Sequence, residues 1–226
     1  MRSFYRALFW VTLFSIAMGY LETSVVVYLR EIYYPAGFRF PLTVMPPKAV
    51  LIELLREAGT VIMLMGIGVL AGHSKPQRFA WFIYSFAIWD IFYYIFLKLL
   101  IGWPANLLTW DILFLIPVPW VGPVLAPCIV SLTMILTALM ILRYEAAGVA
   151  AKMNGRERSL LVIGSVTVIF SFCADFLRHA SSLTQGGVKN YVPQHFDWWV
   201  FILGEAVLSG GIILLGARLK QQRNKK

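Results

Sequence analysis

The chain has 226 residues, of which 59% are hydrophobic and 14% are charged, and its formal net charge is +9. Because soluble domains carry about 25% charged residues, this composition excludes an ordinary soluble domain and predicts an integral membrane protein. At about 20 apolar residues per span, the chain has room for six or seven helices. We therefore expect one transmembrane helical domain over residues 1–226.

Six apolar runs have the length of a membrane span. The first follows a basic segment, MRSFYR, but it is too long for a signal peptide and contains Glu22 and Arg30, so we expect it to be retained. The prediction is an all-α bundle of six transmembrane helices. Their expected ranges are about 5–29, 49–71, 79–101, 123–142, 160–182 and 197–217.

A seventh apolar stretch, residues 106–122, is interrupted by prolines. Pro117 and Pro119 lie within it, and Pro123 and Pro127 follow it. Proline lacks the backbone N–H that a helix interior needs, and irregular backbone at membrane depth is tolerated only where protein or water covers it. We predict a re-entrant or interfacial hairpin between helices 3 and 4.

The basic residues set the predicted orientation. If six helices cross and the N-terminus lies in the cytoplasm, most of the 20 Lys and Arg residues lie on the inner side. If residues 106–122 also crossed, the basic loop 143–158 would move outside and the bias would disappear. We expect a multi-pass protein of the cytoplasmic (inner) cell membrane, with both termini in the cytoplasm and the hairpin on the outer side.

The acidic residues lie where a bilayer disfavours them. All of the 11 except Glu145 and Glu157 occupy the apolar segments or their outer ends. A carboxylate at membrane depth costs roughly 2.5–3.5 kcal/mol, so these groups are expected to face one another, a cation or water. In the predicted topology they lie at mid-depth or in the outer half, which indicates a polar chamber that opens to the outer side.

Simpler interpretations apply to some of these charges. Glu31, Glu53 and Asp197 lie at helix ends, where we expect solvated or capping roles. Arg30 is expected to extend its charge towards the interface. The alternative for the whole set is a charge-paired bundle core, in which arginines neutralise neighbouring acids.

Helical spacing places candidate metal ligands on shared faces. Glu53 and Glu57 have i, i+4 spacing, as do Asp175 and His179. A His and a carboxylate on one face are a feasible pair of metal ligands, and helical bundles with dimetal sites draw Glu and His ligands from several helices. The candidate ligands for a divalent metal ion are Glu22, Glu57, Asp90, Asp175, His179 and Glu205.

The same acids suit a metal-free enzyme that acts on a lipid, an isoprenoid or a quinone, because carboxyl groups serve as general acids and bases. The candidate catalytic residues are Glu57, Asp90 and Asp175. The residues expected to bind the ligand or cofactor are Trp89, Tyr94, Arg56 and Arg178.

Several functions are disfavoured by missing signals. The chain has no Walker A, GxSxG, HExxH or CxxCH motif. Its 3 histidines do not form a pattern for bis-His haem, so no haem is predicted. The basic C-terminal segment RLKQQRNKK fits anionic lipid and not nucleic acid.

Three classes of function remain open, and the sequence does not decide whether the chain is an enzyme. The first is a protein that binds a cation or polar ligand in the chamber, including a metal-dependent membrane enzyme. The second is the metal-free enzyme, and the third is a non-catalytic subunit of a larger membrane complex. Expected partners are membrane lipids, subunits of a membrane complex or a second copy of the chain.

Overall fold

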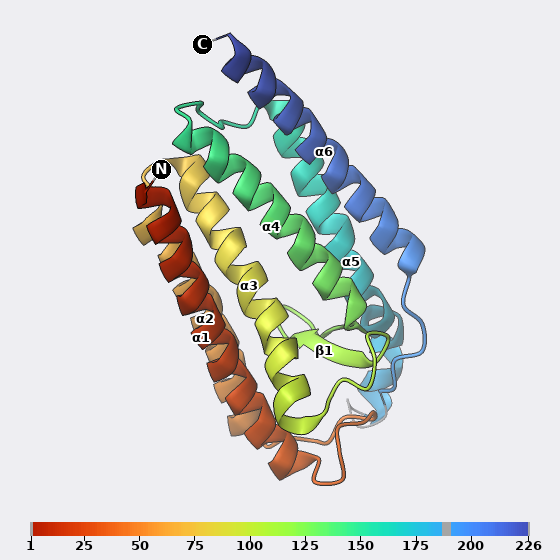
Figure 1. The fold of residues 1–226 in the computed structure, drawn as a ribbon. Helices are drawn as coiled ribbons and strands as arrows, with labels where there is room; N and C mark the ends of the chain where they lie inside the picture. Colours follow the sequence, from red (N-terminus) through yellow and green to blue (C-terminus); the bar gives the residue numbers. More distant parts are fainter. Residues whose placement is uncertain (1, 187–190, 226) are drawn as a thin grey trace.

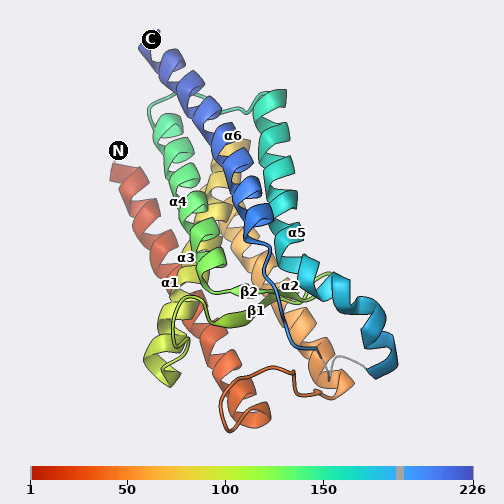
Figure 2. The ribbon, with the colours of Figure 1, turned by 90° about the vertical axis from the view of Figure 1, so that its right-hand side faces the viewer.

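Six long helices and one small β-hairpin make up the described part of the molecule. The computed structural model describes residues 2–186 and 191–225, with side chains for residues 4–179 and 191–225. The helices lie roughly side by side, and the hairpin lies within the half of the bundle away from the chain termini (Figures 1 and 2). In chain order the elements are α1 (Arg2–Tyr33), α2 (Pro47–Ala71), α3 (Lys75–Ile101), β1 (Trp110–Phe114), β2 (Trp120–Pro123), α4 (Leu125–Ala146), α5 (Gly155–Gly186) and α6 (Trp198–Asn224).

All six helices in the described part of the chain are long and apolar enough to cross a membrane. This confirms the predicted all-α membrane architecture. The helices extend the predicted spans by several residues, because polar end segments continue the helix beyond the apolar run. The predicted orientation in the membrane stays a prediction.

Helix α3 is the centre of the first half of the bundle. Helices α1 and α2 both pack against it and touch each other only a little, while α4 packs on another side of α3. The second half is dominated by the pairing of α5 with α6. Because the helices alternate in direction, both chain termini lie at one end of the bundle, and the hairpin lies in the other half (Figure 1).

Two glycines set the close approach of α5 and α6. A Cβ atom added to Gly204 would lie 2.9 Å from the backbone nitrogen of Val168. A Cβ added to Gly164 would lie 2.8 Å from the backbone nitrogen of Leu208. Contact between backbones through small residues is a main way in which membrane helices associate, so these two positions define the α5–α6 interface.

We expect Gly204→Ala to destabilise the folded protein by about 1–3 kcal/mol, the usual cost of overpacking. Gly210→Ala on the same helix is the matched control, because a Cβ there would meet nothing within 4 Å. Thermal unfolding of both variants in the same detergent measures the difference. Equal melting temperatures for the two variants would show that the α5–α6 contact does not depend on Gly204.

The stretch 106–122 forms an antiparallel β-hairpin rather than a helix. Strand β1 pairs with β2 in a register that places Asp111 opposite Gly122, with an irregularity between Ile112 and Phe114. The turn between the strands contains Pro117 and Pro119, which a helix would not tolerate. Asp111 and most of β2 are buried by protein. The hairpin was predicted, whereas its depth in the membrane stays a prediction.

Candidate functional site

A cavity of about 740 Å³ lies at the end of the bundle that carries the hairpin. Its walls come from α1, α2, α3, the loop between α1 and α2, and the hairpin. Most of the lining residues are apolar, as Val26, Leu29, Val50, Leu51 and Leu54 illustrate. Five acidic residues and two arginines also line it. They are Glu22, Glu53, Glu57, Asp90, Asp111, Arg30 and Arg56, and we call the five acids the acidic group.

Arg56 links two members of the acidic group. Its guanidinium forms ion pairs with Glu22 of α1 and with Glu53, which lies one turn earlier on α2. Thr60 donates a hydrogen bond of 3.4 Å to Glu22. Glu53 was expected to be solvated at a helix end, but it is buried. The expectation was wrong because Arg56 and the cavity walls shield Glu53 from solvent.

Glu57 lies on the same helix as Arg56 but has a different partner. Its Oε2 atom accepts a hydrogen bond of 2.9 Å from the backbone N–H of Leu115, in the turn of the hairpin. Glu57 is 8% exposed. This carboxyl group therefore joins α2 to the hairpin across the cavity.

Arg30 makes a second connection to the hairpin. Its Nη2 atom lies 3.2 Å from Oδ1 of Asp111, and both side chains are buried. The guanidinium carbon lies 3.8 Å from the ring centroid of Trp103 and 4.6 Å from that of Phe38. The expectation that Arg30 extends to the interface was wrong, because the aromatic rings and Asp111 hold its charge inside the protein. Burial is the main cause that raises the pKa of Asp111 to about 6, and the positive charge of Arg30 limits this increase.

Asp90 connects the cavity to the fourth helix. Its Oδ2 atom accepts a hydrogen bond of 2.8 Å from the hydroxyl of Ser131 on α4. Its neighbours Trp89 and Tyr94 also line the cavity, and their predicted contact with a ligand stays a prediction. Trp89 is buried, and its indole N–H has no hydrogen-bond partner among the described residues.

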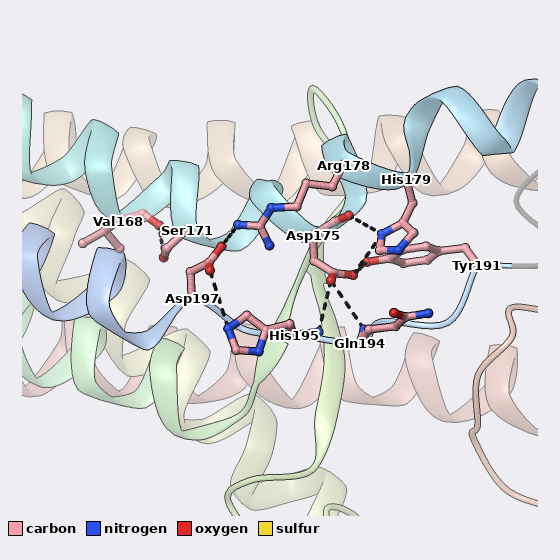
Figure 3. Close-up of polar contacts among 9 residues, drawn as sticks. All are labelled: Val168, Ser171, Asp175, Arg178, His179, Tyr191, Gln194, His195 and Asp197. Atoms are coloured by element: carbon pink, nitrogen blue, oxygen red, sulfur yellow. Dashed lines mark hydrogen bonds and ion pairs between the residues drawn. The ribbon is translucent and has the colours of Figure 1, made fainter.

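A second polar cluster is formed by residues of α5 and of the segment before α6 (Figure 3). None of its residues lines the cavity. Asp175 accepts a hydrogen bond of 2.7 Å from the hydroxyl of Tyr191. It also accepts bonds from the backbone N–H groups of Gln194, at 3.4 Å, and His195, at 3.1 Å. Burial raises the pKa of Tyr191, and its hydrogen bond to Asp175 raises it further. Through these hydrogen bonds, the Asp175 carboxylate holds the segment before α6 against α5.

Arg178 and His179 belong to this second cluster. Arg178 forms an ion pair with Asp197, and Nδ1 of His179 lies 3.8 Å from the carboxylate of Asp175 (Figure 3). Asp197 occupies the N-cap position of α6, as expected, but its side chain is buried and makes no capping hydrogen bond. The expectation of a solvated side chain was wrong because the carboxylate faces Arg178 of α5.

Glu205 occupies a third place. It accepts a hydrogen bond of 2.9 Å from Thr133, which joins α6 to α4. Its other carboxyl oxygen is buried without a hydrogen-bond partner in the described part of the molecule. Glu31, by contrast, is exposed, as predicted for an interface charge.

The structure does not gather the six predicted metal ligands at one point. Glu22, Glu57 and Asp90 line the cavity, whereas Asp175 and His179 lie in the second cluster and Glu205 pairs with Thr133. Across residues 2–186 and 191–225, no three His, Cys, Asp or Glu residues are placed to hold a metal ion. Binding of a metal by a smaller set stays a prediction. Of the three predicted catalytic acids, only Glu57 and Asp90 share a cavity.

Comparisons of this chain with protein-family models, with curated proteins and with solved structures found no match.

Proposed function

We propose that this chain is a multi-pass membrane protein that binds an amphiphilic small molecule in the cavity beneath the hairpin. The supporting observation is the combination of apolar walls with an acidic group inside one cavity of about 740 Å³. Cavities of this size, mostly apolar and with a few convergent polar groups, are typical of small-molecule sites. In the predicted orientation the cavity lies in the outer half of the membrane.

The apolar walls favour a ligand with a hydrocarbon part. Residues on α1 and α2 supply part of these walls, together with the loop between them, α3 and the hairpin, and Val50 and Leu51 of α2 are exposed. Because α1 and α2 touch each other only a little, the cavity lies beside the boundary between these helices and the surrounding lipid. An inorganic cation alone would make no apolar contacts with these walls.

The polar groups favour a head that is cationic or donates hydrogen bonds. Each arginine already pairs with acids: Arg30 with Asp111, and Arg56 with Glu22 and Glu53. Glu57 and Asp90 each have a hydrogen bond to a neutral donor, and neither forms an ion pair among the described residues. These two carboxyl groups are the proposed contacts of the ligand head. An amine head satisfies both, since an ammonium group has three donors.

Acid–base chemistry on the bound ligand is compatible with the same two carboxyl groups. Glu57 lies against the hairpin, and Asp90 lies against α4. Two carboxyl groups in different surroundings are what a general acid and a general base require. Asp175 is not included, because it fastens the segment before α6.

We expect Leu54→Trp to weaken binding of dodecylamine more than tenfold. Leu54 lines the cavity, and the larger side chain fills space that the hydrocarbon chain of the probe would occupy. Leu55→Trp is the matched control, since Leu55 is 64% exposed and does not line the cavity. Native mass spectrometry of the purified protein, titrated with the amine, measures both affinities.

The same titration with dodecanoate tests the charge preference. Because the acidic residues outnumber the arginines in the cavity, we expect dodecylamine to bind at least tenfold more tightly than the fatty acid. The proposal fails if the two probes bind equally well, or if Leu54→Trp and Leu55→Trp have equal effects on dodecylamine binding.

A further inference from the structure

A second cavity lies at the opposite end of the bundle, between the ends of α4 and α6. It is a groove of about 380 Å³, and its lining includes two arginines, Arg143 of α4 and Arg223 of α6. Both helices end at the side of the molecule where the chain termini lie (Figure 1). The groove is separate from the proposed amphiphile site and contains no acidic residue.

Both arginines are free to meet an anion. Neither forms an ion pair with an acidic residue in the described ranges. The guanidinium carbon of Arg223 lies 5.7 Å from the ring centroid of Tyr144, which also lines the groove. This contact positions Arg223 on the same side of α4 as Arg143 without neutralising its charge.

The acidic residues at this end of the bundle already have hydrogen-bond or ion-pair partners within the protein. Glu145 accepts hydrogen bonds from Ser74, from Gln77 and from the backbone of Ala151. Glu157 forms an ion pair with Arg218, at 2.7 Å. These internal partners leave Arg143 and Arg223 without a carboxylate to pair with.

The apolar part of the groove lies deeper along α4. Leu136, Leu139 and Met140 line it, and Leu136 precedes Arg143 by two turns, or about 10 Å along the helix axis. The groove therefore presents charge at the end of the bundle and hydrocarbon further in. This order matches a phospholipid, whose phosphate lies at the membrane surface and whose acyl chains lie below it.

We propose that the groove between α4 and α6 binds the phosphate of an anionic phospholipid through Arg143 and Arg223, with an acyl chain against Leu136, Leu139 and Met140. Basic pockets between transmembrane helices on the cytoplasmic side are known to bind anionic head groups. The proposal places the lipid in a defined groove, in contrast to a general attraction of the basic C-terminal segment to the surface. A purely structural alternative is that both arginines only stabilise the negative C-terminal ends of their helices.

The test is native mass spectrometry of the full-length protein, titrated with phosphatidylglycerol and with phosphatidylcholine of the same acyl chains. We expect wild type to prefer phosphatidylglycerol at least tenfold. The double variant Arg143→Gln and Arg223→Gln should weaken phosphatidylglycerol binding about 25-fold, since each basic residue near an anionic lipid contributes about fivefold. A variant with Lys220→Gln and Lys225→Gln removes two charges at the same end that do not line the groove, and it should stay within about twofold of wild type.

A second measurement keeps the test valid if the arginine variant is less stable. Phosphatidylglycerol should raise the melting temperature of wild type and of the lysine variant, but not that of the arginine variant. The proposal is overturned if wild type shows no preference for phosphatidylglycerol, or if the lysine variant loses as much affinity as the arginine variant. It is also overturned if glycerol 3-phosphate, which lacks acyl chains, binds as tightly as the lipid.

Discussion

Replacing Asp111 with Asn is expected to destabilise the folded protein by about 3–5 kcal/mol, because it leaves the buried charge of Arg30 without its partner. The two groups lie 3.2 Å apart, with side-chain exposures of 9% for Arg30 and 3% for Asp111. Arg30→Met should cause a loss of similar size, since it leaves Asp111 unpaired. Thermal and chemical unfolding in one detergent measure both effects.

The double variant Arg30→Met and Asp111→Leu should recover most of the lost stability. Hydrophobic residues of similar volume often replace a buried ion pair with little net cost, and the Met thioether makes favourable contacts with aromatic rings such as those of Trp103 and Phe38. Glu31→Gln, next to Arg30 but exposed, is the control and should change stability by less than about 0.5 kcal/mol. Additive losses in the double variant would contradict the assigned pairing.

Replacing Glu57 with Gln is expected to weaken binding of dodecylamine about tenfold to a hundredfold. A hydrogen bond to a charged group contributes about 1.5–3 kcal/mol, and this variant removes the charge from the proposed contact of the ligand head. The fold should survive, because the side-chain oxygen of Gln accepts the Leu115 N–H as the carboxylate does.

The head-group specificity is the second measurement for this variant. Dodecanoate should bind to Glu57→Gln at least as well as to wild type, because one repelling charge is gone. Glu31→Gln, outside the cavity, should leave both affinities unchanged. Weaker binding of both probes to Glu57→Gln would indicate a distorted cavity rather than a lost head-group contact.

The architecture follows largely from the sequence. Each helix corresponds to an apolar run of spanning length, and Pro117 and Pro119 correctly excluded a helix at 106–122. The close contact at Gly164 and Gly204 was not predicted. Helices α2, α5 and α6 each contain several glycines, and only the crossing geometry of α5 and α6 shows that Gly164 and Gly204 face a neighbouring backbone.

The site residues stay predictions, but the structure brings some of them together. Glu22, Arg56 and Glu57 line one cavity, since the topology brings the end of α1 to the start of α2. The pairing of Arg30 with Asp111 was missed, because these residues are 81 positions apart in the sequence and meet only through the fold of the hairpin. Asp175 was wrongly expected to lie in the same chamber. It binds the backbone N–H groups of residues 194 and 195, and such backbone contacts cannot be recognised from the pattern of side chains.

The two bonds that hold the hairpin start on the two helices that flank the cavity: Arg30 is on α1, and Glu57 is on α2. These helices are joined mainly through α3. In the proposed function, a ligand that moves α1 away from α2 pulls on both bonds, so we expect displacement of the hairpin to accompany such a movement.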